Sequence, residues 1–236
     1  MDIETKSRLL NNARTWFREE LAAAHVENVA KLKSLAEFNI NPFTWRYLAN
    51  FLDGNSDPES LARVLILPRA LGTSISTSFG ARAQGFITRI FDGVLGSQIP
   101  GMDIEFIDQL DGRKKFCQVK SGPQVINSGD VADIKGKFKA ASNLARANHL
   151  EVMVGDYVFG LLYGEQSQLN AFIKDIQVDH TTYVGKDFWH HITGDEKFYE
   201  TLTEEIGKIA EEFDGRSVLE ETIHRLAIEI EKQGLA

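Results

Sequence analysis

The feature that most constrains this chain is a pair of short apolar runs separated by an Asp-Gly pair. The first run begins at residues 101–103 and the second occupies 116–122, where apolar and polar positions alternate with the period of two of a strand. Asp111-Gly112 between them is a strong signal for a hairpin. We therefore expect three polar side chains to meet at one edge of an antiparallel pair: Asp103, Gln118 and Lys120.

These three side chains suit a divalent cation. The carboxylate of Asp103 and the amide oxygen of Gln118 are hard donors, and the backbone carbonyl of Val119 adds a third oxygen. The Lys120 ammonium would stand beside a metal-bound water. The alternative is an ordinary surface hairpin with a solvated lysine, which leaves unexplained why Lys120 leads directly into Ser-Gly-Pro rather than into more strand.

At these positions the sequence resembles the PD-(D/E)xK nucleases. Asp103 matches the aspartate of the motif, and Gln118-Val119-Lys120 stands where Asp/Glu-x-Lys is usual. The resemblance implies that Asp103, Gln118 and Lys120 are catalytic and that Asp103, Gln118 and Val119 hold Mg²⁺. The glutamine departs from the pattern. Its amide offers an oxygen but no charge, so we expect weaker metal affinity and slower catalysis.

Short segments elsewhere extend the likeness over residues 39–205. They lie at 39–43, 78–91, 120–122, 162–164 and 184–189. Their order is similar to that of type II restriction endonucleases of the branch that cuts GGNCC-type sites. This resemblance implies an α/β, restriction-endonuclease-like core, in which a central mixed sheet is flanked by helices, with helical extensions at both ends. We expect one nuclease domain over residues 1–236, with 1–40 as a helical extension that is a candidate for dimerisation.

The activity implied by the resemblance is site-specific, Mg²⁺-dependent hydrolysis of phosphodiester bonds in double-stranded DNA. Because cutting both strands of a palindrome requires two sites related by a two-fold axis, we expect a homodimer. Two alternatives stay open. One is a DNA-binding protein of the same fold that has lost activity through Gln118, and the other is a non-nuclease α/β domain that binds a protein partner. A repair or nicking nuclease of the same fold is a further alternative, against which a strict dimer would count.

The net charge of -8 argues against a nucleic-acid partner, but the charge is unevenly distributed. Residues 112–148 contain eight lysine or arginine residues and two acids, whereas residues 195–236 contain five and twelve. The basic residues therefore gather on the hairpin and on the helix expected between Asp130 and Asn148. The acidic C-terminal part is interpreted as a solvated surface.

Residues after the hairpin are candidates for DNA contact. The loop 121–129 is rich in amides and hydroxyls, which pair with base edges or phosphates, and the following helix carries a basic stripe beside an apolar one. The candidates are Ser121, Gln124, Asn127, Ser128, Lys135 and Lys139. The loop can equally be a plain polar connection in which Ser128 or Asp130 caps the helix, and the stripe a merely solvated face.

Two further residues are secondary candidates. Glu105 shares a strand face with Asp103 if the strand is regular, so it could supply the second carboxylate that Gln118 lacks. Otherwise it faces solvent or accepts a hydrogen bond from Lys120. Gln84, on a helix expected over 79–91, occupies the position where many relatives have an acid of the metal site, and we expect it to have a structural role.

The rest of the sequence predicts helices at both ends and strands between them. Residues 3–36, 196–213 and 217–232 have apolar stripes at helical spacing, Asp57-Pro58 begins a helix that Pro68 bends or ends, and 151–163 is a strand. The single cysteine, Cys117, excludes a disulfide framework and is expected to be buried. The longest apolar run, 158–163, is too short to span a bilayer, so we expect a cytoplasmic protein with no membrane partner.

Overall fold

The structure is a computed structural model that describes residues 1–235, and the chain divides into two compact units. Unit 1 comprises Met1–Trp16 and Gly80–Lys208, and unit 2 comprises Phe17–Phe79 and the residues from Ile209 onward. Both units combine segments that are distant in the sequence. The division does not test the expectation of one nuclease domain over 1–236, which stays a prediction.

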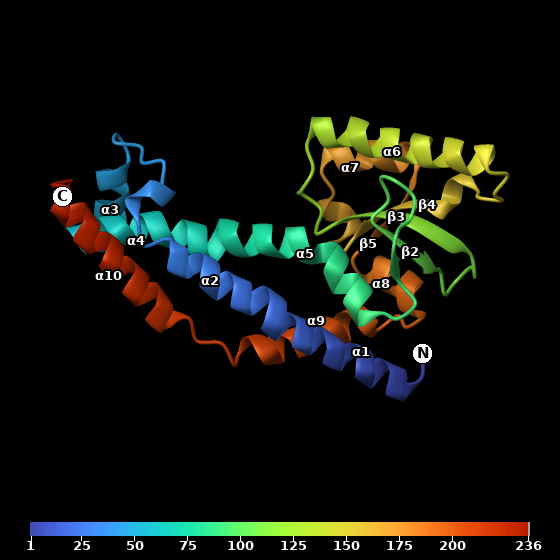
Figure 1. Cartoon of the computed structure of the whole chain (residues 1–236), viewed down its shortest axis with the longest axis horizontal. Helices are drawn as coiled ribbons and strands as arrows, with labels where there is room; N and C mark the ends of the chain where they lie inside the picture. Colours follow the sequence, from blue (N-terminus) through green and yellow to red (C-terminus); the bar gives the residue numbers. More distant parts are fainter. Residues whose placement is uncertain (236) are drawn as a thin grey trace. The chain divides into compact units, whose positions relative to one another are not determined.

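Unit 1 contains a five-stranded sheet and the helices around it (Figure 1). Its helices are α1 (Ile3–Trp16), most of α5 (Ile75–Ile90), α6 (Ser128–Ala147), α7 (Ala171–Asp179), α8 (Lys186–Thr193) and most of α9 (Phe198–Ala210). Its strands are β1 (Leu95–Gly96), β2 (Ile104–Ile107), β3 (Lys114–Lys120), β4 (Tyr157–Leu161) and β5 (Thr181–Val184). The expected α/β fold with helices at both ends of the chain is confirmed.

The sheet is mixed, with the strand order β1-β2-β3-β4-β5. β1, β2 and β3 pair antiparallel, whereas β3, β4 and β5 pair parallel. The predicted hairpin is the β2–β3 pair. Its turn includes Gly112, whose φ of 72° is one that glycine adopts readily and whose N–H donates to the carbonyl of Asp108 at 2.8 Å. The Asp-Gly signal therefore located the hairpin correctly.

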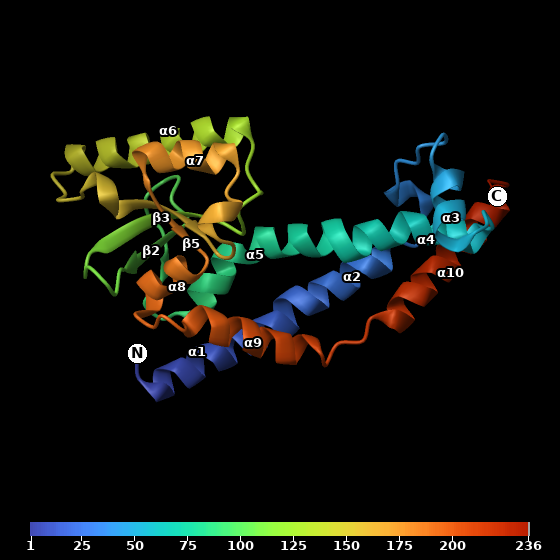
Figure 2. The ribbon, with the colours of Figure 1, turned by 180° about the vertical axis from the view of Figure 1, so that it is seen from behind.

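The register of β3 places its alternate side chains on the two faces of the sheet. Ile104 pairs with Cys117 and Glu105 with Phe116, so Phe116, Gln118 and Lys120 share one face. Helices α6 and α7 lie over this face in both views (Figures 1 and 2). The core there is a single apolar cluster: Met102, Phe116, Ile126, Val131, Ile134, Phe138, Ala141, Tyr157, Phe159, Leu161, Leu169, Ile173, Ile176 and Val184. The apolar stripe predicted for α6 is therefore its buried side.

The opposite face of the sheet packs closely against α8. A Cβ atom on Gly160 of β4 would lie 2.5 Å from the ring of Phe188 and 2.9 Å from the sulfur of Cys117, so only glycine allows this approach. Cys117 is fully buried, and burial raises the pKa of its thiol well above its usual value. The prediction that Cys117 is a buried apolar residue is confirmed.

The strand expected over residues 151–163 is shorter than predicted. Only Tyr157–Leu161 forms β4, and Val154–Asp156 is a 3-10 turn in which the carboxylate of Asp156 accepts the N–H of Met153 at 2.9 Å. Asp156 also forms ion pairs with the guanidinium of Arg113 and, at 3.1 Å, with the ammonium of buried Lys115. This ion cluster attaches the turn end of the hairpin to the start of β4, which is why the chain cannot remain extended before Tyr157.

Replacing Asp156 by alanine is expected to destabilise the protein by about 3 kcal/mol or more, because Lys115 would stay buried with half of its charge partners removed. The hydrogen bond from Arg113 is the main cause that holds the pKa of Asp156 far below its usual range. Its contribution is therefore fully present at neutral pH and is lost only as the pH falls through that lowered pKa. Urea unfolding at pH 7.5 measures the effect.

The matched control for this prediction is Asp111→Ala. Asp111 also pairs with Lys115, at 2.5 Å, but its side chain is 43% exposed. An exposed partner contributes less than about 1 kcal/mol. Equal losses in the two variants would contradict the buried-cluster explanation.

Unit 2 is helical. Its elements are a π-helical turn (Phe17–Ala22), α2 (Ala23–Lys31), a 3-10 turn (Leu35–Glu37), α3 (Trp45–Asp53), α4 (Pro58–Pro68), a second π-helical turn (Arg69–Ser74), the start of α5, and α10 (Arg216–Lys232). As predicted, Asp57 caps α4 by accepting the N–H of Ser60 at 2.8 Å, and α4 ends at Pro68. The predicted helix over 3–36 is divided by the first π-helical turn and ends at Lys31.

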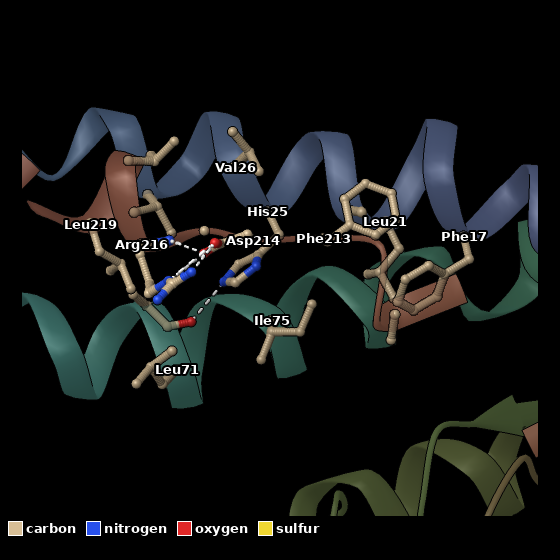
Figure 3. A pocket seen from close by; sticks show the side chains of 16 residues that line it. Phe17, Leu21, His25, Val26, Leu71, Ile75, Phe213, Asp214, Arg216 and Leu219 are labelled. Carbon is tan, nitrogen blue, oxygen red and sulfur yellow. Dashed lines mark hydrogen bonds and ion pairs between the residues drawn. The ribbon is translucent and has the colours of Figure 1, made fainter. Parts of the chain in front are cut away.

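An apolar hollow of about 330 Å³ lies in unit 2 (Figure 3). Phe17 and Phe213, whose rings are 6.1 Å apart, lie at one end, and the ion pair of Asp214 with Arg216 lies toward the other. Most of the lining is apolar and the carboxylate in it, Asp214, is paired with Arg216, so the hollow does not offer the set of oxygen donors that a hard cation requires. Within residues 1–235, no helix is both long and apolar enough to cross a membrane.

Candidate active site

Asp103 lies just before β2 and is held against the edge of β3. Its N–H donates to the carbonyl of Cys117 at 2.9 Å, and its Oδ2 accepts the N–H of Val119 at 2.7 Å. Burial raises the pKa of the Asp103 carboxyl, while that hydrogen bond and the charges of Lys137 and Lys120 act in the opposite direction. A partly desolvated carboxylate near two ammonium groups is well placed to gain from a bound cation.

Gln118 is buried on the face of the sheet that α6 covers, with 4% of its surface exposed. Its Nε2 donates to the carbonyl of Gly101, two residues before Asp103. Because the nitrogen is the donor, the amide oxygen keeps its acceptor capacity. Val119 directs its N–H toward Asp103, and its carbonyl points to the same edge because both backbone groups of a strand residue do so. The Asp103 carboxylate and the Val119 backbone thus lie together at the end of β3, and the Gln118 side chain is anchored two residues before Asp103.

Lys120 ends β3 and extends toward the start of α6. Its carbonyl accepts the N–H of Leu162 at 3.2 Å, which fixes the backbone against the end of β4. Its ammonium lies 3.8 Å from Oδ1 of Asp130, and 36% of the side chain is exposed. The ammonium is therefore weakly paired and accessible, as a group that meets a phosphate must be.

Lys137 of α6 is a neighbour of Asp103 that the sequence pattern did not single out. Its side chain packs on Gly101, where an added Cβ would lie 2.9 Å from Cγ of Lys137, and its ammonium pairs with Asp133 at 2.7 Å. Gly101, with a φ of 88°, provides both the turn and the space for this contact. The sequence did contain a signal for this difference. Residues two positions apart, such as Lys135 and Lys137, point to different sides of a helix, so the two lysines could not share one surface.

The donors of this site fit Mg²⁺ better than a softer metal. Among residues 1–235 no group of three or more histidine, cysteine or acidic side chains is placed to hold a metal ion. Mg²⁺ does not require such a group, since it is usually bound through one or two carboxylates and keeps several waters. Asp103 with the oxygens of Gln118 and Val119 meets that description.

A family model described as type II restriction endonuclease EcoO109I matches residues 57–214. The match covers more than half of the chain and contains the whole β2–β3 hairpin and α6. The chain belongs to this family. The search of curated proteins found no match. Membership of the EcoO109I family implies a type II restriction endonuclease, a hydrolase that acts on DNA.

The two secondary candidates have different surroundings in this EcoO109I-family chain. Gln84, exposed on α5, donates from Nε2 to the carbonyl of Asp103 at 2.6 Å, a contact that positions the site. The carboxylate of Glu105 accepts Ser97 Oγ at 2.7 Å and the N–H of Gln98 at 3.0 Å, and it pairs with Lys114 at 2.5 Å. Burial by itself would raise the pKa of Glu105, but these hydrogen bonds outweigh burial, and the pKa is lowered. The cationic partner of Glu105 is Lys114, and not Lys120 as the sequence suggested.

The loop after β3 combines exposed and buried candidates. Gln124, Asn127 and Ser128 are exposed, whereas Ser121 is buried with its hydroxyl toward Gly80 of α5. Gln124 donates to the carbonyl of Gln168 at 2.6 Å. The helix cap is Asn127, whose Oδ1 accepts the N–H of Gly129 at 2.8 Å, and Asp130 completes a capping box. Of the two capping residues expected, Ser128 or Asp130, Asp130 takes part through the capping box, whereas Ser128 is the first helical residue.

The two basic candidates of α6 differ in how they are paired. Lys135 binds Asp179 at 2.7 Å and Asp175 at 3.1 Å, both on α7, and these hydrogen bonds raise its pKa. Lys139 is exposed. Lys135 thus joins α6 to α7, so of the two residues Lys139 has the geometry better suited to a phosphate. DNA contact by either residue stays a prediction.

Proposed function

We propose that this EcoO109I-family protein is a Mg²⁺-dependent endonuclease of the PD-(D/E)xK type that cuts double-stranded DNA at a GGNCC-type site. The observation that carries the proposal is the hydrogen bond from the Val119 N–H to the Asp103 carboxylate, which brings Asp103 to the strand that carries Gln118 and Lys120. The setting is one nuclease domain, 1–236, that acts in the cytoplasm.

Each residue has a defined role in this proposal. Asp103, the Gln118 amide oxygen and the Val119 carbonyl would hold Mg²⁺, which when bound neutralises phosphate charge and lowers the pKa of water. Lys120 orients the attacking water and stabilises the charge that develops on the phosphate oxygens. Lys137 adds positive charge at the same place, and Gln84 holds the Asp103 backbone.

The proposed DNA contacts come from the segment that follows Lys120. The exposed amides and hydroxyls of Gln124, Asn127 and Ser128 suit base edges or phosphates, and Lys139 suits a phosphate. Because each chain contributes one Asp103–Lys120 set, cleavage of both strands of a palindrome calls for a homodimer.

Incubation with phage DNA in Mg²⁺ tests the proposed function. Discrete fragments that disappear in EDTA would support a site-specific metal nuclease, and sequencing of the fragment ends would give the recognition site and the stagger. Intact DNA over a range of Mg²⁺ and Mn²⁺ concentrations would refute the proposal. Salt-sensitive binding of the uncut DNA would then favour an inactive DNA-binding protein, and absence of such binding a protein-interaction domain.

Gln118→Glu is expected to lower the Mg²⁺ concentration that gives half-maximal cleavage by roughly tenfold, because metal affinity rises with the number of charged ligands. The variant loses the donation from Nε2 to Gly101, so in metal-free buffer its melting temperature should fall. Cleavage rates over a Mg²⁺ titration measure the effect. Gln124→Glu, a change of the same charge in the exposed loop, serves as the control. A Mg²⁺ requirement that is unchanged or higher would count against Gln118 as a ligand.

A further inference from the structure

Five large apolar side chains gather on the outward side of α3 and the turn before it. The exposed fractions are 92% for Phe43, 64% for Tyr47, 44% for Leu48, 76% for Phe51 and 50% for Leu52. They are spaced at i, i+4, i+5, i+8 and i+9, which places them on one side of the helix. The rings of Tyr47 and Phe51 contact each other, with centroids 5.9 Å apart. We call this surface the α3 outer face.

The inward side of α3 is already packed. Trp45 and Ala49 are buried in the core of unit 2, and the indole N–H of Trp45 donates to the carbonyl of Leu61 at 3.0 Å. Helix α3 lies against α4 in both views (Figures 1 and 2). A helix with apolar residues on both sides is normally packed against other protein on both sides. The α3 outer face therefore lacks its cover in the single chain.

We propose that the α3 outer face is the surface through which two copies of this chain associate. The choice of a second copy rests on the proposed function, which requires two Asp103–Lys120 sets for one duplex site. In a two-fold contact the same residues face each other across the axis. Tyr47 and Phe51, at the middle of the stripe, would lie nearest that axis.

The charges on and around the α3 outer face are compatible with a second copy and argue against an anionic membrane. The α3 outer face has no charged member, so two chains that each carry a net charge of -8 can meet there without opposing like charges. The charges at its border are engaged within the chain: Arg46 donates to the carbonyl of Leu235 at 2.8 Å, and Asp53 pairs with Arg63 at 3.3 Å. A helix that binds an anionic membrane carries a basic polar face, and α3 has one arginine.

The size of the surface also fits a dimer. With roughly 200 Å² for each aromatic side chain, Phe43, Tyr47 and Phe51 alone expose about 450 Å². A stable interface buries about 800 Å² on each partner, so these three rings would form more than half of it. The patch matches the largest apolar patch of a typical monomer, about 300–600 Å², and such a patch often marks an interaction site.

Sedimentation equilibrium of the full chain tests the oligomeric state. The wild-type protein is expected at twice the chain mass of 26.4 kDa, and the double variant Tyr47→Glu/Phe51→Glu at the chain mass, with dimerisation weakened at least roughly a hundredfold. Val178→Glu, at a residue of α7 that is 78% exposed, is the matched control and should stay dimeric. Circular dichroism verifies that each variant is folded. A monomeric wild type, or a dimeric double variant, would overturn the proposal.

Cross-linking gives a second test that does not depend on a destabilising change. The only native cysteine, Cys117, is fully buried, so a short bismaleimide reports on an introduced thiol. Phe51→Cys is expected to give a covalent dimer, and Val178→Cys is not. A protein that is dimeric while Phe51→Cys fails to cross-link would use another surface, such as the helical segment 1–40, and the proposal would fail.

The interface and the nuclease proposal can fail separately. A wild-type dimer that loses its association in the double variant but leaves DNA intact would support the interface and refute the nuclease. A monomer that cuts DNA in Mg²⁺ would refute the interface and support the nuclease. A monomer that adsorbs to vesicles of anionic lipid, or that pairs with a different protein, would likewise overturn the second copy as the occupant.

Discussion

Cleavage by a Lys120→Ala variant is expected to be slower than wild type by about a thousandfold, the loss that follows removal of a group that stabilises charge in the transition state. The ammonium is accessible and its carboxylate partner, Asp130, is 3.8 Å away, so little of its charge is neutralised within the chain. The change removes no buried contact, so folding should be unaffected. Initial rates on a labelled duplex at saturating Mg²⁺ provide the measurement.

Lys174→Ala is the matched control for Lys120. Lys174 is an exposed lysine of α7 in unit 1 and is not among the candidates for DNA contact. Its removal should change the cleavage rate by no more than about threefold, in line with the small contribution of an exposed charge. A Lys120→Ala protein that cuts within tenfold of wild type would remove this lysine from the proposed mechanism.

Asp103→Asn is expected to lower cleavage by at least about a thousandfold while making the metal-free protein more stable at neutral pH. The amide has the shape of the carboxylate, and its oxygen can still accept the N–H of Val119. It cannot supply the charge that a hard cation requires. Loss of activity from a variant that is at least as stable as wild type would separate a ligand role from a structural one.

The stability gain follows from the direction of the pKa change. Burial raises the pKa of Asp103 in the folded protein above its unfolded value. The favourable contribution of the protonated group is present below the unfolded pKa and is lost as the pH rises through the folded one, so at pH 7.5 the charged carboxylate destabilises the fold. Urea unfolding in EDTA should show the Asp103→Asn gain at pH 7.5 and its disappearance at pH 3.

Glu105→Gln provides a control for which the expected change in folding stability has the opposite sign. The pKa of Glu105 is lowered, since the hydrogen bonds from Lys114, Ser97 and Gln98 outweigh the effect of burial. Its charged form therefore stabilises the fold at pH 7.5, and the glutamine variant should be less stable there. A loss of stability in both variants would mean that the raised pKa of Asp103 does not govern its effect.

Local signals account for the part of the site that the sequence predicted. Alternation with period two assigned Gln118 and Lys120 to one face, and the Asp-Gly pair placed Asp103 opposite them, because a hairpin register is set by its turn. Both signals act over fewer than about twenty residues. The same is true of the Asp57 cap and of the apolar stripe on α6.

Partners that are distant in the sequence explain where the prediction stopped. Lys135 and Lys139 looked equivalent on the helix, but only the packing of α7 against α6 brings Asp175 and Asp179 to Lys135. Lys137 reaches the site because Gly101 leaves room for it. The strand expected from 151 was shortened because Asp156 is drawn into the ion cluster with Arg113 and Lys115.

The sequence by itself determined the β2–β3 hairpin and the helices at both ends, because each depends on the order of neighbouring residues along the chain, and the α/β class followed from the resemblance to a known family. Only the tertiary structure decided which lysines approach Asp103, which carboxylates are engaged, and that one side of α3 is filled while Phe43, Tyr47 and Phe51 stay exposed. The physical reason is that burial and charge pairing depend on contacts between segments that are far apart in the sequence. The spacing of residues shows which of them share a face of a helix or strand, but it does not show which other segment packs against that face.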